Sequence, residues 1–554
     1  MSYSAAYAVP PSHLCRLLWF GGEHRRFDAL FTGMTLSEGV RRSSEDARTL
    51  LEVEGRGSVE VVPTFMFDDA VETLRSHYVN LLILDLRWTD HVEQDIERAR
   101  RLLEYLDRGE DIEQRYGFHR ILVLLSGEDA YRIDSLLLEL GALGVRHVLR
   151  DVRPDGNYAI TRDAHSDAFS TRVLHEALSL VGQRRTGKTA ICASGGGITG
   201  IFFELGALKC IEDCLGGRPI NEFDMLFGIS AGAVITSLLA VGYRIQDIMA
   251  AVAGVPGYAI EPLDLSLLNP RHLNVLDASW RVGTAARSTA SWAWRAVRGQ
   301  SLSEEEQFRE TTGMIGAPFQ SYQFERMLRS LLLARGGHND FSLLQRPLYI
   351  GATDQDERRH VLFGDEEFRD VPISKAVQAS LSINPAFTAV KIGDRYYEDG
   401  AITRTSDFQE AIRREATLIF ILDPFVPYVS PHPGLAHRRG LLYNIDQNIR
   451  TISYTRFENT RDSELRKYPD VSTYTFLPSN RQRWLLSRNP MDHRPWLPIW
   501  KAAYLSTLQR FRQLRHRLAG DLREHHWHLD LAPAQQVADR LERSAHLSFA
   551  DFLL

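Results

Sequence analysis

Cysteine and long hydrophobic runs are both scarce in this sequence, and each shortage excludes a class of protein. Four cysteines in 554 residues are too few for a disulfide framework, so we expect a reducing, cytoplasmic compartment. No run approaches the roughly 20 apolar residues of a membrane-spanning helix, so any membrane contact should be peripheral, at the inner face. The N-terminus lacks a basic segment followed by an apolar one, and we therefore expect no signal peptide.

The sequence also lacks an excess of positive charge. Its formal net charge of −6 argues against a general nucleic-acid binder. With 44% hydrophobic and 25% charged residues, the composition is that of a folded globular protein. The chain is too long for one hydrophobic core, so we expect two to four domains.

Residues 1–186 alternate apolar runs with amphipathic segments. The apolar runs, rich in leucine and β-branched residues, predict strands at 14–20, 59–63, 80–86, 120–126 and 145–150. Helical patterns lie at 68–77, 91–106, 129–140 and 165–181. Apolar strands that alternate with helices are typical of a parallel, doubly wound sheet. We therefore expect a flavodoxin-like α/β domain, followed by a linker.

The first 150 residues or so of this part resemble a response-regulator receiver domain, with Asp85 at the end of the third strand. The resemblance implies that Asp85 is the phosphoacceptor. Receivers hold Mg²⁺ with an acidic pair after the first strand, where this chain has Gly21-Gly22-Glu23 and a single carboxylate. Two interpretations stay open: phosphorylation of Asp85, or a degenerate receiver-like module that binds a signalling partner.

Gly182 to Thr189 match the spacing of a phosphate-binding P-loop. A P-loop follows a strand and opens a helix, because the helix N-terminus and the loop amides surround the phosphates. Here a helical pattern precedes the motif and a strand-like run, 190–193, follows it. We interpret the segment as a linker between domains and expect no cofactor.

The best candidate for a catalytic residue is Ser230, in the stretch 223–234. An apolar strand there runs into Gly-Ile-Ser-Ala-Gly at Gly228–Gly232, and an Ala/Val/Leu-rich helix follows. A strand that turns directly into a helix needs small residues on both sides of the corner, because a side chain there would collide with the neighbouring backbone. The pattern predicts that Ser230 lies at a helix N-terminus with the geometry of a nucleophile.

A second glycine-rich motif lies one strand earlier. Gly195, Gly196, Gly197 and Gly200 follow the run at 190–193 and precede a helix at 202–212. Successive glycines at a helix N-terminus leave backbone N–H groups available to an anion, either a phosphate or the oxyanion of an acyl-transfer intermediate. The amides of Gly195, Gly196 and Gly197 are therefore a candidate oxyanion hole.

The base that activates Ser230 is expected downstream. Residues 390–398 predict a β-hairpin that ends in Asp399-Gly400-Ala401. An aspartate in such a turn can point back at the serine and accept its proton. A histidine base is the alternative, since His432 and His437 follow, although neither stands in a strand-to-loop setting after an acidic partner.

These three motifs, in this order, resemble the patatin-like phospholipase family over residues 189–425. The resemblance implies a three-layer α/β/α hydrolase domain, placed at 187–430, with a Ser230–Asp399 dyad and no metal. The implied function is a serine acyl hydrolase that cleaves the ester bonds of lipids, phospholipid or lysophospholipid. One departure is Thr199, where the family commonly has Lys or Arg.

Residues 431–554 predict a mainly helical C-terminal extension. Its stretch 482–526 is rich in arginine and tryptophan, which fits either a surface on anionic lipid or a solvated helical face. Similar alternatives apply to 255–337, with Trp280, Trp292 and Trp294: a cap at a lipid–water interface, or ordinary core and surface.

A second class of function stays open on the sequence. In it the chain is a signalling or scaffold protein whose patatin-like domain is catalytically idle and whose receiver-like module binds a partner. Loss of ester hydrolysis on replacing Ser230 or Asp399 would distinguish the two classes.

Overall fold

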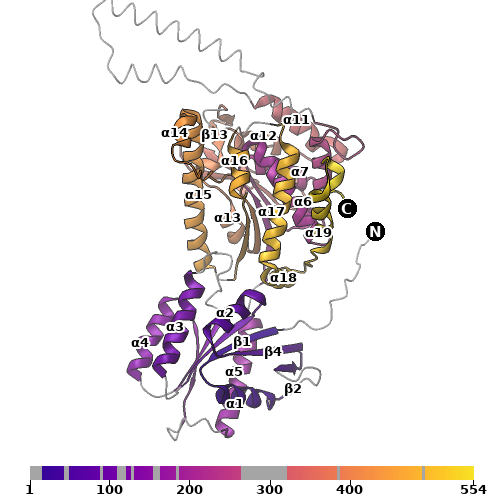
Figure 1. The fold of residues 1–554 in the computed structure, drawn as a ribbon. Helices are drawn as coiled ribbons and strands as arrows, with labels where there is room; N and C mark the ends of the chain where they lie inside the picture. The colour runs from indigo at the N-terminus through magenta and orange to yellow at the C-terminus, as the bar shows by residue number, and fades with distance from the viewer. Residues whose placement is uncertain are drawn as a thin grey trace, which may run out of the picture. The chain divides into compact units, whose positions relative to one another are not determined.

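The computed structural model describes residues 15–42, 49–55, 57–87, 92–108, 120–126, 130–153, 162–182, 186–263, 321–383, 387–468, 470–488 and 493–554. The chain divides into two compact units. Unit 1 comprises residues 1–186 with 514–521, and unit 2 comprises 187–513 with 522–554. In Figure 1, the indigo and purple elements from β1 to α5 belong to unit 1.

Unit 1 contains a seven-stranded sheet in the order β2-β3-β4-β1-β5-β6-β7. Its strands are β1 (Cys15–Gly21), β2 (Val40–Arg42), β3 (Leu50–Val53), β4 (Gly57–Thr64), β5 (Leu81–Leu86), β6 (Ile121–Ser126) and β7 (His147–Asp151). Strands β4, β1, β5, β6 and β7 are parallel, in the order of a flavodoxin-like sheet. The antiparallel hairpin β2–β3 extends the sheet beyond β4.

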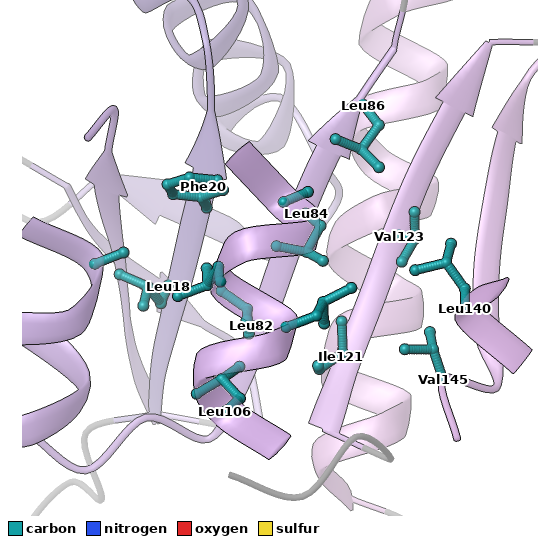
Figure 2. Close-up of a cluster of buried hydrophobic side chains, with 14 of the residues drawn as sticks. Leu18, Phe20, Leu82, Leu84, Leu86, Leu106, Ile121, Val123, Leu140 and Val145 are labelled. Carbon is teal, nitrogen blue, oxygen red and sulfur yellow. The ribbon is translucent and has the colours of Figure 1, made fainter. Parts of the chain in front are cut away.

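Helices cover both faces of this sheet: α1 (His24–Thr35), α2 (Phe67–Ser76), α3 (Val92–Arg108), α4 (Ala130–Ala142) and α5 (Ala164–Gly182). Successive strand residues point to opposite faces and so enter different cores. Leu82 and Leu84 pack with Leu106 of α3 and with residues of α2 and α4 (Figure 2). Leu81 and Ile83 pack with residues of α1 and α5. Both faces are therefore buried.

The expected α/β class is confirmed, and each strand and helix predicted for residues 1–186 is present with its ends shifted by a residue or two. Helix α1 and the hairpin β2–β3 were not predicted from the sequence. Helix α1 begins without a capping side chain or an acidic first turn, so it lacks the usual signals of a helix start. Strand β2 has only three residues, too few to show a periodic pattern.

Unit 2 contains a mixed sheet in the order β12-β13-β10-β9-β8-β14-β15, with β11 paired to β10. Strands β8 (Lys188–Ala193), β9 (Met225–Ile229), β10 (Leu348–Asp354), β14 (Ala416–Leu422) and β15 (Ser472–Phe476) are parallel. Strands β11 (His360–Phe363), β12 (Val390–Ile392) and β13 (Arg395–Asp399) are antiparallel to their neighbours.

Helices lie on both faces of this sheet as well (Figure 1). Phe408 and Phe457, from α13 and α15, pack on one face, whereas Phe511 of α17 packs on Phe420 from the other. The helices of unit 2 are α6 (Gly197–Cys214), α7 (Ala231–Ala240), α8 (Ile245–Val252), α11 (Tyr322–Leu333), α12 (Ile373–Ser380), α13 (Phe408–Arg413), α14 (Leu435–Arg439), α15 (Leu441–Lys467), α16 (Asn480–Arg488), α17 (Trp496–Gln513) and α19 (Ala532–Arg543); α18 (Arg515–Glu524) is divided between the units.

The C-terminal residues are mostly helical, as expected, but they also complete the sheet of unit 2. Strand β15 pairs in parallel with β14 from Leu418↔Ser472 to Leu422↔Phe476. Trp500 and Tyr504 of α17 are fully buried, and the Tyr504 hydroxyl donates to Asp213 of α6 at 2.6 Å. These two aromatic side chains are core residues, so they offer no surface to lipid.

Of the described helices, none is both long and apolar enough to cross a membrane. Trp280, Trp292 and Trp294, considered above as part of a cap, lie outside the described residues.

Replacing Leu82 by alanine should lower the free energy of unfolding of unit 1 by about 2–5 kcal/mol, because the cavity left in a packed core is not refilled. Chemical denaturation measures this change. Leu138→Ala is the matched control, since the Leu138 side chain on α4 is 76% exposed whereas Leu82 is 0% exposed. The control should change stability by less than about 0.5 kcal/mol. Equal losses in the two variants would contradict the burial of Leu82.

Candidate active site

The strand register of unit 2 brings the three sequence motifs to one edge of the sheet. Ala193, just before the glycine loop, pairs with Gly228. Gly351 pairs with Ile229, the residue before Ser230, and the next residue of β10, Ala352, pairs with Asp399. The three motifs are about 35, 170 and 200 residues apart in sequence, and they end side by side because their strands are neighbours in the sheet.

Ser230 lies at the corner between β9 and α7. Its backbone has φ 53° and ψ −117°, a conformation that non-glycine residues rarely adopt and that is found at strained functional turns. A side chain at Gly232 would collide with the backbone of Ala193, so only glycine lets α7 pass this close to β8. The elbow predicted from the sequence is present, and the Ser230 residue is 7% exposed.

Ser380, at the end of α12, supports this corner. The backbone N–H of Ser230 donates to Ser380 Oγ at 2.8 Å, and the Ser380 hydroxyl donates to the Gly351 carbonyl at 2.6 Å. The strained residue is thus tied to β10 through one buried side chain. The sequence offered only a weak signal for this role, the run of small residues around Ser380.

Asp399 is the last residue of β13 and is 1% exposed. Its Oδ1 accepts the N–H of Ala401 at 2.8 Å, and its carbonyl accepts the hydroxyl of Thr353 at 2.9 Å. Burial raises the pKa of Asp399 to about 7, although hydrogen bonds from Ala401 N–H and the Ser230 side chain lower it. A carboxyl group with this pKa, bonded to a serine hydroxyl, is suited to accept a proton near neutral pH.

The glycine loop approaches the same serine. A Cβ on Gly195 would lie 3.2 Å from Cβ of Ser230 and 3.7 Å from its Oγ. Helix α6 begins at Gly197, whose φ of 65° is in the left-handed region. First-turn amides have no acceptor within their own helix, and they lie at the positive end of the helix dipole. The loop can therefore present N–H groups to an oxyanion formed at Ser230.

Thr199, where the related family commonly has a basic residue, is fully buried. Its hydroxyl lies 3.3 Å from the carbonyl of Leu486 on α16 and 3.5 Å from that of Gly196. At this position, Thr199 therefore joins the start of α6 to α16 in the C-terminal part of the chain.

Two buried carboxyl groups that were not predicted as site residues, Glu204 and Asp423, lie near the glycine loop. Burial, and then the charge of Asp423, raises the pKa of Glu204 well above its ordinary value, although a backbone interaction with Ser194 lowers it. Burial also raises the pKa of Asp423 to about 7, against the lowering effects of Phe425 N–H and the charge of Arg450. The available signal was the position of Asp423 directly after β14, at the carboxyl end of a parallel strand.

A polar network lies behind Asp399. The hydroxyls of Thr353 and Thr403 are 2.8 Å apart, and Nδ1 of His360 is 2.9 Å from the Thr403 hydroxyl. Nε2 of His360 lies 2.8 Å from Oδ1 of Asp407. The network reaches Asp399 only at its backbone carbonyl, and it therefore fixes the strand end rather than the carboxylate.

The other candidates lie away from Ser230 or are already engaged. His432 and His437 are exposed on the segment 431–440. The P-loop-like segment follows α5 and runs into β8, the inverted order expected of a linker. Within the described ranges, no group of three or more His, Cys, Asp or Glu side chains could hold a metal ion.

Asp85 lies in unit 1 at the carboxyl end of β5 and is buried. Arg87 donates to its two carboxyl oxygens from Nε at 2.9 Å and from Nη2 at 2.7 Å, and Trp19 Nε1 lies 3.2 Å from Oδ2. Burial raises the pKa of Asp85, but the charge and hydrogen bonds of Arg87 outweigh it, and the pKa is below its ordinary value. A phosphoryl group could reach Asp85 only if Arg87 moved away.

Residues 191–412 match the family model described as patatin-like phospholipase. The chain therefore carries a patatin-like phospholipase domain, and this domain contains Gly195–Gly200, Ser230 and Asp399.

Two curated proteins match parts of the chain. A cUMP-AMP-activated phospholipase of Escherichia coli is 45% identical over 60 residues, which are 11% of this chain and 18% of that protein. An FMN-dependent NADH:quinone oxidoreductase of Delftia acidovorans is 32% identical over 94 residues, 17% of this chain and 43% of that protein. The chain thus spans less than half the length of either relative.

Among solved structures, VipD from Legionella pneumophila aligns with 66% of this chain and 83% of its own, at 14% identity and a TM-score of 0.24. A superposition of this quality does not establish a shared architecture.

Ser380→Ala should destabilise unit 2 by about 1–3 kcal/mol, because the buried N–H of Ser230 loses its acceptor. The melting temperature measures the effect. Ser330→Ala is the control, since the Ser330 hydroxyl is exposed and donates to Met327 of its own helix. An unchanged melting temperature in Ser380→Ala would mean that Ser380 does not support the corner.

Proposed function

We propose that this protein is a serine acyl hydrolase that cleaves ester bonds of phospholipids or lysophospholipids, with Ser230 as nucleophile and Asp399 as base. The observation that carries the proposal is Ser230, whose backbone is strained at a strand-to-helix corner and whose side chain interacts with the buried Asp399 carboxyl, of pKa about 7. The lipid nature of the substrate rests on the patatin-like phospholipase domain at 191–412.

In the first half of the reaction, Ser230 Oγ attacks the ester carbonyl carbon while Asp399 accepts the hydroxyl proton. The electron pair of the C=O bond moves to the oxygen, where the amides of Gly195, Gly196 and Gly197 stabilise the negative charge. When the intermediate collapses, the bond to the alcohol breaks and Asp399 returns its proton to that oxygen. An acyl-Ser230 ester remains.

In the second half, a water molecule takes the place of the alcohol. Asp399 accepts one proton from the water as its oxygen attacks the acyl carbon, and Ser230 regains a proton as it leaves. The products are a fatty acid and the deacylated lipid, and the enzyme returns to its starting state. Removing a glycine-loop donor from such a site costs about 10²–10³-fold in rate, so the loop carries much of the acceleration.

Unit 1 has no role in these steps. We propose that it binds a signalling partner and regulates the hydrolase, because Asp85 is already paired with Arg87 and the phosphoacceptor interpretation would require that pair to break. The cytoplasmic location, with peripheral contact to the inner face of a membrane, belongs to the same proposal.

Replacing Ser230 by alanine, or Asp399 by asparagine, should abolish the release of fatty acid from phospholipid vesicles and lysophospholipid micelles. The expected loss in kcat is at least about 10³-fold for each, because the two residues act as one unit. A fluorophosphonate probe should label the wild type and leave Ser230→Ala unlabelled.

Ser237→Ala is a suitable control, since the Ser237 hydroxyl donates to Val234 within α7. Full hydrolysis by Asp399→Asn would exclude the dyad. A wild type that neither hydrolyses lipid nor accepts the probe would instead favour the idle, partner-binding interpretation.

The activity should rise with pH and reach half its maximum near pH 7. Asp399 works as a base only in its carboxylate form, and burial raises its pKa to about 7. Below that pH, kcat/KM should fall about tenfold per pH unit. A pH series of initial rates measures the midpoint.

Asp423 also has a pKa of about 7, raised by burial, and it lies near the glycine loop, so its contribution to the pH profile is tested by its own variant. Asp423→Asn should retain the acid limb of the pH profile, which is the fall in rate below about pH 7, whatever its absolute rate. Loss of the limb in this variant would assign the titration to Asp423 instead of Asp399.

A further inference from the structure

Helix α15 lies beyond residues 191–412, the part of the chain that matches the family model, yet it contacts segments on both sides of the site. The Thr405 hydroxyl donates to the carbonyl of Ser453 at 2.9 Å. One helical turn earlier, Nη1 of Arg450 lies 3.4 Å from the Pro424 carbonyl, and its guanidinium stacks on the ring of Phe425. Because both contacts are buried, this face of α15 is fixed against the catalytic edge of the sheet.

Pro424 connects the helix to the glycine loop. A Cβ on Gly196 would lie 2.8 Å from Pro424 Cγ, and one on Gly200 would lie 3.3 Å from it. The proline ring therefore packs directly against the backbone that starts α6. Arg450, which holds the Pro424 carbonyl, thus anchors α15 beside the candidate oxyanion hole.

Arg456 lies one helical turn beyond Ser453 on α15, beside the loop that follows Asp399. Its Nη1 donates to the carbonyl of Ile402 at 2.8 Å, and its Nη2 donates to the carbonyl of Ala401 at 3.0 Å. Ala401 in turn donates its N–H to Oδ1 of Asp399. One guanidinium therefore binds two consecutive carbonyls of the short turn whose Ala401 amide holds the Asp399 carboxylate.

The contacts of Arg456 fix the position of the turn, and its charge does not act on the pKa of Asp399. The groups that shift the pKa of Asp399 are its burial, Ala401 N–H, the Ser230 side chain and Glu398; Arg456 is not one of them. Burial partly desolvates the guanidinium and so lowers the pKa of Arg456 below its ordinary value. A planar guanidinium held on two carbonyls restricts the movement of the turn without neutralising the charge of the Asp399 carboxylate.

We propose that Arg456 is a positioning residue that holds the turn Gly400–Ile402, and through the Ala401 N–H the Asp399 carboxylate, in line with Ser230. The proposal rests on the function proposed above. It makes α15, a helix outside the matched domain, part of the catalytic machinery.

Arg456→Met removes the guanidinium and retains an unbranched side chain of similar length. Loosening the turn should lower kcat about 10–100-fold, the cost of a misplacement of about 1 Å, with little change in KM. It should also move the acid limb to higher pH, because the Ala401 N–H bond that lowers the pKa of Asp399 weakens. Arg456→Lys, which can still donate to a carbonyl, should recover part of the loss.

The rates are measured on phospholipid vesicles and divided by the active-site concentration, which fluorophosphonate labelling of Ser230 gives. Lys467→Met is the matched control, because it removes one cation from the same helix about three turns further on, where Lys467 is 60% exposed and pairs with Glu464. This control should keep the wild-type kcat and pH midpoint.

A purely structural role for Arg456 would lower the number of active sites and leave kcat per site and the midpoint unchanged, and that result would overturn the proposal. If wild-type protein showed no hydrolysis and no labelling, the proposed function itself would fail, and this inference with it. An active wild type with an equally active Arg456→Met would overturn the inference alone.

Discussion

The burial of the Asp399 carboxylate is the constraint on which the candidate active site depends. Desolvation raises its pKa to about 7 and so turns a weak base into one matched to neutral pH. A buried carboxylate needs hydrogen-bond donors, and here they are the Ala401 N–H and the side chain of Ser230. The same environment would be destabilising if either donor were misplaced, since an unpaired buried charge is costly. The surrounding structure is therefore organised to hold one short turn.

That organisation draws on the whole of unit 2. Strand β10 fixes the corner of Ser230 through Ser380 and the end of β13 through Thr353. Helix α15 contacts the turn after Asp399 and the proline behind the glycine loop. Strand β15 and helix α17, both from the last hundred residues, complete the sheet and cover one face. The C-terminal residues are thus an integral layer of unit 2.

The buried carboxylate of Asp85 in unit 1 has a lowered pKa, whereas the pKa of Asp399 is raised. Asp85 is also buried near the carboxyl end of a strand, but Arg87 binds it on two oxygens, and its pKa is held below the ordinary value. The charge-assisted pair with Arg87 keeps Asp85 in its ionised form. Similar strand-end positions in the two units therefore give two different chemical environments, because the nearest partner differs.

The sequence by itself determined the elements and their local chemistry. Apolar runs and helical periodicity located five strands of the unit 1 sheet, and in unit 2 they located β8, β9 and the hairpin β12–β13 but not β10, β11, β14 or β15. Glycine spacing identified the corner at Ser230 and the loop at Gly195–Gly197, because steric limits on a strand-to-helix turn are local. The role of Ser380, the polar network behind Asp399, the pairing of Asp85 with Arg87, the placement of β15 and the clamp of Arg456 were decided by the tertiary structure. Each of these depends on burial or on the register of distant strands and helices, and neither quantity is encoded in a short stretch of residues.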